Sequence, residues 1–137
     1  MTPSLQQLGL AVKRLQWQHH REMNRRLAPL GLSLVQWDTL RHLHENPDAS
    51  LHELAELTFQ TDQSMGELAK RMVDRGYIER VQGAGRRVRH RLTPVGDELR
   101  RAGGEVADGV LTESLGQLSA DERETLYQLL LAASTDR

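Results

Sequence analysis

The sequence predicts a mainly α-helical fold that carries one small β-hairpin, and three patterns in its 137 residues support this prediction. Apolar residues recur every three or four positions over most of the chain, which is the period of amphipathic helices. The period changes to two between residues 77 and 92, as two short strands require. Ser or Thr residues that can cap helices stand where the helical periods begin.

A single domain over residues 1–137 is expected, because a hydrophobic share of 38% supplies one modest core. We divide it into a lobe at residues 33–93 and a helical lobe made of residues 1–30 and 94–137. Because the chain shows neither a membrane-length apolar run nor a signal-peptide pattern, we expect a cytoplasmic protein without membrane contact. It has no cysteine, so disulfides, thiolate metal sites and cysteine nucleophiles are excluded.

The first third of the chain predicts two helices. Apolar residues at helical spacing run along residues 4–28, and Pro29 ends that helix. Ser33 and Gln36 form a capping box, in which the two side chains satisfy two orphan backbone amides. A second helix therefore begins there and ends before Pro47.

Two short helices joined by a tight turn follow at about residues 51–75. Ser50 and Glu53 form a second capping box, which starts the shorter helix. After a short break Thr61 caps the next helix, and Gly76 supplies the left-handed residue that ends it. The apolar stripe expected to face the core consists of Met65, Leu68, Ala69 and Met72.

A β-hairpin with an arginine-rich face is predicted next. Strands at residues 77–81 and 88–92 flank a glycine-rich tip. The run from residue 80 to residue 96 contains no acidic residue, whereas the C-terminal part of the chain is acid-rich. The five arginines of this run are Arg80, Arg86, Arg87, Arg89 and Arg91. The face opposite to the last three is expected to carry Val88, His90 and Leu92.

Two further helices complete the prediction. Thr93 caps one of them, with Pro94 at its first position, and Gly103 with Gly104 is expected to bend or weaken it. Ser119 opens a third capping box and starts the last helix.

This order of elements is a winged helix-turn-helix flanked by N- and C-terminal helices, and it predicts binding to double-stranded DNA. A recognition helix fits the major groove, and an arginine wing suits the minor groove and the phosphates. A solvated strand face and a core helix without a ligand are the plainer alternatives. The acid-free wing favours DNA, since contacts with phosphates release counterions. The expected DNA-binding residues are Thr61, Gln63, Ser64, Glu67, Lys70 and Arg71 on the helix, and Arg80, Arg86, Arg87 and Arg89 in the wing.

Three segments, together with the arginine wing, form a recognisable set: Asp74-Arg-Gly-Tyr-Ile-Glu-Arg80, Arg91-Leu-Thr-Pro-Val-Gly96 and Leu118-Ser-Ala-Asp-Glu-Arg123. Together they resemble the MarR (multiple antibiotic resistance regulator) family, and the resemblance covers nearly the whole chain. It implies a transcriptional regulator, most often a repressor, that binds a pseudo-palindromic site as an obligate homodimer with interleaved terminal helices.

Two positions depart from the family pattern. Members usually carry Asp-x-Arg in the wing; Arg86 matches the arginine, but Ala84 stands in place of the acid. On the recognition helix, Gly66 and Glu67 occupy positions where members often have a hydroxyl residue and a basic one. Glu67 either accepts a hydrogen bond from cytosine N4 or repels phosphate, and the sequence leaves both alternatives open.

The terminal helices predict a dimer interface, because they would otherwise expose their apolar stripes. The residues expected there are Leu5, Leu8, Val12, Leu126 and Leu130. The plain alternative is that these stripes pack within one subunit.

By the same resemblance, a small aromatic or anionic effector would bind between the dimerisation helices and the winged lobe. The residues expected to line its pocket are Trp17, His20, Arg21 and Trp37. The plainer alternative is that each of these tryptophans is a core residue.

The sequence offers weaker support for three other functions. Zinc sensing is suggested by six histidines, but the adjacent His19 and His20 point about 100° apart on a helix, and His42 and His44 diverge further. No nucleophile–base pair or phosphate-binding loop indicates an enzyme, and we expect no metal or cofactor. A protein–protein adaptor that has lost DNA binding is the remaining alternative, and the arginine wing disfavours it.

Overall fold

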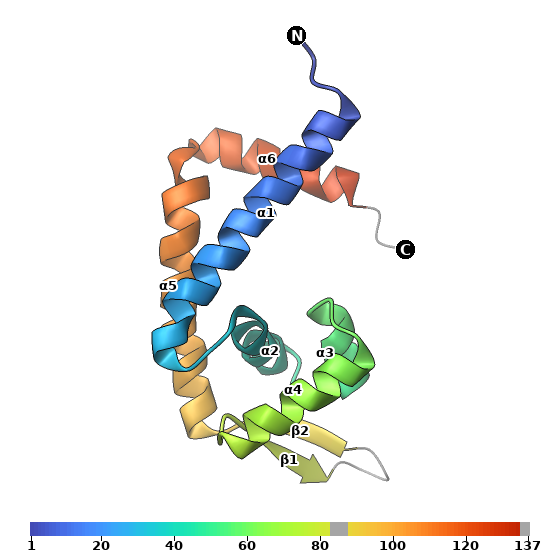
Figure 1. The fold of residues 1–137 in the computed structure, drawn as a ribbon, viewed down its shortest axis with the longest axis vertical. Coiled ribbons are helices and arrows are strands. Elements are labelled where there is room, and N and C mark those ends of the chain that lie inside the picture. The colour runs from blue at the N-terminus through green and yellow to red at the C-terminus, as the bar shows by residue number, and fades with distance from the viewer. Residues whose placement is uncertain (83–87, 135–137) are drawn as a thin grey trace.

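The computed structural model describes residues 1–82 and 88–134 and confirms a mainly helical fold with one hairpin (Figure 1). The elements in chain order are α1 Leu5–Leu27, the 3-10 helix η1 Ala28–Leu30, α2 Leu34–Glu45, α3 Leu51–Leu57, α4 Asp62–Asp74, β1 Ile78–Gln82, β2 Val88–Leu92, α5 Pro94–Ser114, the 3-10 helix η2 Leu115–Gln117 and α6 Ala120–Ala133. Within the described ranges, no helix is long and apolar enough to cross a membrane.

Local capping chemistry starts four of the helices. Complete capping boxes stand before α1, α2, α3 and α6, where a Ser hydroxyl accepts the backbone N–H three positions on. The boxes at Ser33, Ser50 and Ser119 confirm the sequence prediction, and the box at Ser4 is an addition to it. Each such cap stabilises its helix by about 1 kcal/mol, so these starts do not depend on distant contacts.

The elements form two groups that α5 connects. Helix α5 packs against both α1 and α2, while α2, α3, α4 and the hairpin gather at the end away from α6 (Figure 1). The two strands pair antiparallel, with Ile78 opposite Leu92 and Gln82 opposite Val88. The hairpin therefore emerges directly beside α4.

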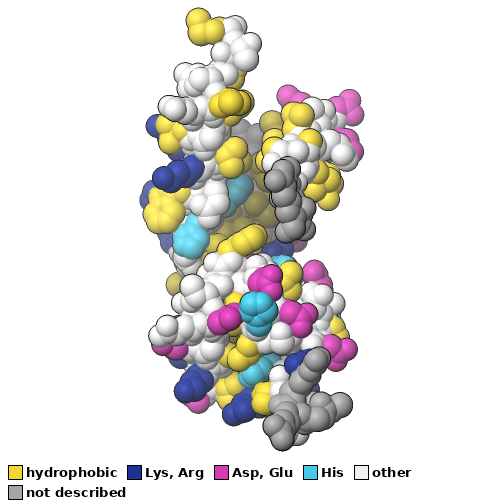
Figure 2. All heavy atoms as spheres, turned by 90° about the vertical axis from the view of Figure 1, so that its right-hand side faces the viewer, with side chains coloured by type: hydrophobic (Ala, Val, Ile, Leu, Met, Phe, Trp, Pro, Cys, Tyr) yellow, Lys and Arg dark blue, Asp and Glu magenta, His cyan; other side chains and the backbone are white. Residues whose placement is uncertain are grey.

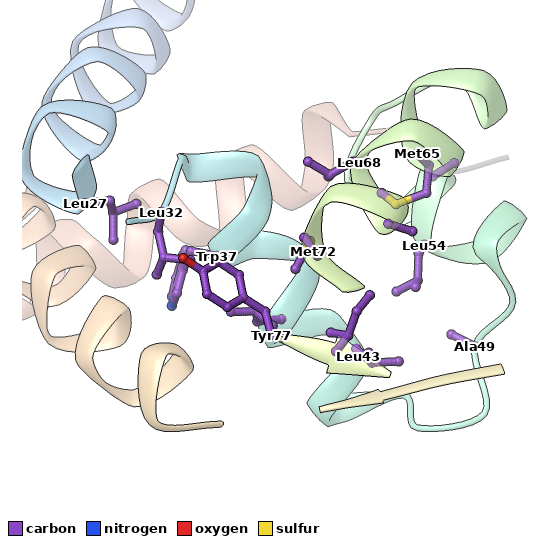
Figure 3. Close-up of a cluster of buried hydrophobic side chains, with 14 of the residues drawn as sticks. Leu27, Leu32, Trp37, Leu43, Ala49, Leu54, Met65, Leu68, Met72 and Tyr77 are labelled. Atoms are coloured by element: carbon purple, nitrogen blue, oxygen red, sulfur yellow. The ribbon is translucent and has the colours of Figure 1, made fainter. Parts of the chain in front are cut away.

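The core lies mainly inside the helix-turn-helix group. Met65, Leu68 and Met72 of α4 point into a cluster that also contains Leu43 and Leu54 (Figure 3). Both methionines have no exposed side-chain surface. The apolar stripe predicted for this helix is thus confirmed, and its burial sets how α4 is rotated about its own axis.

The glycine pair in α5 does not interrupt the helix, which is continuous from Pro94 to Ser114. Gly103 instead receives the ring of Trp37, because a Cβ atom there would lie 2.3 Å from Trp37 Cδ1. The indole Nε1 of Trp37 donates a hydrogen bond to the carbonyl oxygen of Arg100 at 3.0 Å. At Gly104 a Cβ atom would meet no described atom within 4 Å.

These neighbours give a matched pair of substitutions. Gly103→Ala should lower the free energy of unfolding by about 1–3 kcal/mol, because the new methyl group overpacks the contact with Trp37. Gly104→Ala should raise it by about 0.5–1 kcal/mol through helix propensity alone. Urea denaturation of both variants measures these changes, and equal effects of the two substitutions would contradict the assigned packing.

Candidate nucleic-acid interface

Helices α3 and α4 are joined by a short turn that local contacts define. The hydroxyl of Thr58 is buried and donates to the carbonyl oxygen of Leu54 at 2.7 Å. Phe59 then adopts a left-handed backbone conformation with φ of 59°. Thr61 caps α4 by accepting the backbone N–H of Ser64 at 3.0 Å. The predicted helix-turn-helix therefore exists, with α4 as its second helix (Figure 1).

One face of α4 opens onto a groove of about 750 Å³ between this helix and the hairpin. Positions three, four or seven residues apart lie on one side of a helix. From α4 the groove is lined by Gln63, Gly66, Glu67, Lys70 and Asp74, among others, and from the hairpin by Arg80, Val88 and His90. Acidic, basic and amide side chains thus converge on a space with a partly apolar floor.

The structure brings together four of the predicted DNA-binding residues around this groove: Gln63, Glu67, Lys70 and Arg80. Ser64 and Arg71 are exposed on α4 but do not line it, because they are turned by about 80–100° from Gln63. The guanidinium of Arg89 is half-buried and donates to the carbonyl oxygen of Val88. Ala84, Arg86 and Arg87 lie outside the described residues.

The inner face of the hairpin matches its predicted alternation. His90 is buried, Val88 and Leu92 are half-buried, and Arg91 on the opposite face is exposed. Burial, followed by the positive charge of Arg80, lowers the pKa of His90. The groove therefore has a histidine at its floor that resists protonation in the folded protein.

Sequence reasoning missed a histidine that links α3 to α4. His52 Nδ1 lies 2.8 Å from Asp62 Oδ1, and His52 Nε2 lies 2.8 Å from Glu56 Oε1. Both carboxylates accept, so both ring nitrogens can donate only when the imidazole is protonated. The hydrogen bond and charge of Asp62, then the charge of Glu56, raise the pKa of His52. The spacing of His52 and Glu56 by four residues was the available signal, but the contact with Asp62 depends on the turn.

The predicted dimer residues are largely uncovered in the single chain. Leu5 is 86% exposed, and Leu8, Val12 and Leu130 are exposed as well, while Leu126 is half-buried. Helix α6, described over its whole length, contains no buried residue.

The predicted effector residues separate into two environments. Trp17 and His20 stack with ring centroids 5.5 Å apart, and Arg21 beside them is exposed. Trp37 is buried against Gly103 and belongs to the core.

Among residues 1–82 and 88–134, no group of three or more histidine and acidic side chains is placed to hold a metal ion. His19 Nε2 lies 2.6 Å from the hydroxyl of Ser114, and His42 lies 3.6 Å from Asp38. The histidines of the first two helices thus face separate partners.

Comparison with known proteins shows which family the chain is similar to. A family model described as MarR family matches residues 30–87. The transcriptional regulator HosA of Escherichia coli is 31% identical over 101 residues, which cover 72% of this chain and 75% of HosA. The HTH-type transcriptional repressor Rv2887 of Mycobacterium tuberculosis is 28% identical over 117 residues, or 84% of each chain.

Solved structures share the fold over nearly the whole length. A mutant MarR from E. coli complexed with operator DNA matches with a TM-score of 0.84 at 22% identity, covering 93% of this chain and 94% of that one. Rv2887 in complex with DNA matches with a TM-score of 0.79 at 25% identity, covering 98% and 100%. Rv2887 in complex with salicylic acid matches with a TM-score of 0.76 at 26% identity, covering 98% of each.

The His52 bridge predicts a pH-dependent contribution to stability. Because its pKa is raised above the ordinary 6.5, the bridge stabilises the fold fully below about pH 6.5 and loses this effect as pH rises through the folded-state pKa. The melting temperature of the unmodified protein should therefore exceed that of His52→Gln at pH 5.5, and the difference should shrink by pH 9.

His44→Gln is the matched control, since that exposed ring lies 3.9 Å from Asp97 and bridges no pair of carboxylates in the described structure. Its melting temperature should follow the unmodified protein at both pH values. A His52→Gln difference that grows with pH would contradict the bridge.

Proposed function

The chain belongs to the MarR family and is a transcriptional regulator, and we propose that it represses transcription as a homodimer that binds a pseudo-palindromic operator and leaves it when a small aromatic acid binds. The observation that carries DNA binding is the polar face of α4 beside the hairpin. Gln63, Lys70 and Arg80 converge there on one open groove. Helices of this size enter the major groove with such a face toward the base edges.

Support for the operator contact also comes from charge. Lys70 and Arg71 are exposed on α4, and Arg80 is exposed at the start of the hairpin. The sequence adds Arg86 and Arg87 between the two strands, and the proposal assigns them contacts with phosphates or the minor groove. The relatives support this use, since Rv2887 and MarR have each been crystallised with DNA.

Dimerisation is supported by the uncovered apolar surface at the other end of the molecule. Hydrophobic side chains gather on the upper part of the face in Figure 2, around the hollow between its two upward projections. Leu5 and Val12 of α1 and Leu130 of α6 are all at least 45% exposed. A second copy would cover this surface and hold two α4 helices about 34–36 Å apart, one turn of DNA. The proposed lobes are residues 33–93 for DNA and residues 1–30 with 94–137 for the dimer.

An effector site is supported by the face of α1 below that surface. His20 and Arg21 follow Trp17 by three and four residues, so each of them is a neighbour of Trp17 on the surface of the helix. The exposed indole of Trp17 can stack on an aromatic ring, and Arg21 can pair with a carboxylate. Rv2887 has been crystallised with salicylic acid. Trp37 is left out of the proposed pocket, because its indole N–H already bonds within the chain.

The operator proposal is tested by fluorescence anisotropy with duplex DNA from upstream of the protein's own gene, at several salt concentrations. We expect tight binding that weakens steeply with salt. Lys70→Ala and the double variant Arg86→Ala/Arg87→Ala should each bind more weakly, and the slope of log K against log salt should fall by about 0.9 for each lost phosphate contact. Arg101→Ala, which changes an exposed arginine of α5 away from the groove, should bind as the unmodified protein does.

The dimer proposal is tested with the double variant Leu126→Glu/Leu130→Glu, by sedimentation and by the same titration. This variant should sediment as a monomer and lose affinity for the full operator, because its two half-sites are no longer bound together. If the unmodified protein bound neither this duplex nor random DNA at low salt, the repressor proposal would fail and the adaptor alternative would replace it.

The effector proposal is tested by intrinsic fluorescence, since the chain has two tryptophans. Salicylate should quench Trp17 and release operator DNA from the unmodified protein. Trp17→Phe leaves buried Trp37 as the one tryptophan and should show no quenching of tryptophan emission. Arg21→Ala should weaken the response about tenfold, as loss of a charge-assisted hydrogen bond does. Equal quenching in Trp17→Phe would place the ligand elsewhere.

A further inference from the structure

Gly66 stands in the middle of α4 without a structural reason to be glycine. Its backbone is helical, and a Cβ atom there would meet no atom of the described residues within 4 Å. Glycine weakens a helix interior relative to alanine, because it loses more backbone freedom on folding. The folded chain therefore tolerates a less stable helix at this position and gains no packing contact from it.

Two other helical glycines, in contrast, are required by close packing. A Cβ atom at Gly96 would lie 1.9 Å from the carbonyl oxygen of Tyr77, and one at Gly103 would strike Trp37. Gly9 and Gly104 are as open as Gly66, but they lie in α1 and α5 and do not line the groove. Gly66 combines an open position with a place on the groove face of α4.

Glu67, the next residue, also lines the groove. Lys70 and Arg71 stand three and four residues further along the same helix, the spacing at which opposite charges pair. Among the described residues, however, Glu67 forms no ion pair, whereas Glu22 and Glu56 do. A carboxylate that forms no ion pair and has basic residues one turn away has both a free acceptor and neighbours that reduce its repulsion by phosphate.

A carboxylate at the floor of the major groove needs a hydrogen-bond donor. The donors on base edges there are the amino groups of cytosine N4 and adenine N6, and Glu pairs characteristically with cytosine N4. Glutamate is shorter than arginine or lysine, so its helix must approach the bases closely. A glycine beside it removes the side-chain carbon that would hold the helix away.

We propose that Gly66 is the point of closest approach between α4 and the operator, and that this approach lets Glu67 accept a hydrogen bond from cytosine N4. Each half-site then contains one C·G pair that the protein requires. This inference rests on the proposed function and adds to it the chemistry of one operator position.

The experiment uses an operator selected from random duplexes with the unmodified full-length protein. Dissociation constants are measured for every base pair at each half-site position. We expect one position at which replacing C·G weakens binding about tenfold or more, and we expect Glu67→Gln to reduce that preference to about threefold or less. Random duplex measures binding that does not depend on sequence.

Gly66→Ala separates DNA contact from folding. It should raise the melting temperature by about 2–4 °C through helix propensity, yet weaken operator binding about tenfold or more and leave binding to random duplex unchanged. Gly104→Ala is the matched control, an equally open helical glycine away from the groove. It should raise the melting temperature similarly without changing operator binding.

Two results would overturn this inference without contradicting the proposed function as a regulator. One is that Glu67→Gln tightens binding to all duplexes by the same factor, which would show that Glu67 only repels phosphate. The other is that Gly66→Ala binds the operator as tightly as the unmodified protein. If the unmodified protein bound no duplex at low salt, the proposed function itself would fail.

Discussion

The burial of one apolar stripe on α4 is the constraint on which the interface depends. Met65, Leu68 and Met72 are each less than 5% exposed, and together their burial contributes on the order of 5 kcal/mol. Because successive helical residues are about 100° apart, holding these three inward leaves little freedom in where the others point. Gln63 and Lys70 face the hairpin for this reason, before any interaction with DNA.

A second set of contacts ties this group to the long helices. Tyr77, between α4 and the hairpin, donates its hydroxyl to the carbonyl oxygen of Gly31 at 2.8 Å. Its own carbonyl accepts the backbone N–H of Thr93 at 3.1 Å and lies against Gly96 at the start of α5. A movement of α1 relative to α5 would therefore act on Tyr77, which lies just after the C-terminal end of α4. Under the proposed function, these contacts would connect an effector bound on α1 to the position of α4.

Elements that depend on neighbouring residues were predictable. The capping boxes at Ser33, Ser50 and Ser119 use contacts three residues apart, and all three appear as expected. The alternation that buries His90 is equally local, since a strand turns successive side chains to opposite faces. The site was predicted in part, because helical spacing shows that Gln63 and Lys70 share a face but does not show that the face borders Arg80 of the hairpin.

The sequence by itself determined the family, the order of the elements, their capped starts and the stripe of α4 that is buried, because these follow from periodicity and contacts within a few residues. Only the tertiary structure decided which glycines have space for a side chain and which do not. Gly103 and Gly104 look alike in sequence, yet one receives Trp37 from a segment over sixty residues away. The contact between His52 and Asp62 across the turn was decided in the same way, and so was the position of Gly66 on the groove. Both depend on how separate elements are placed in space.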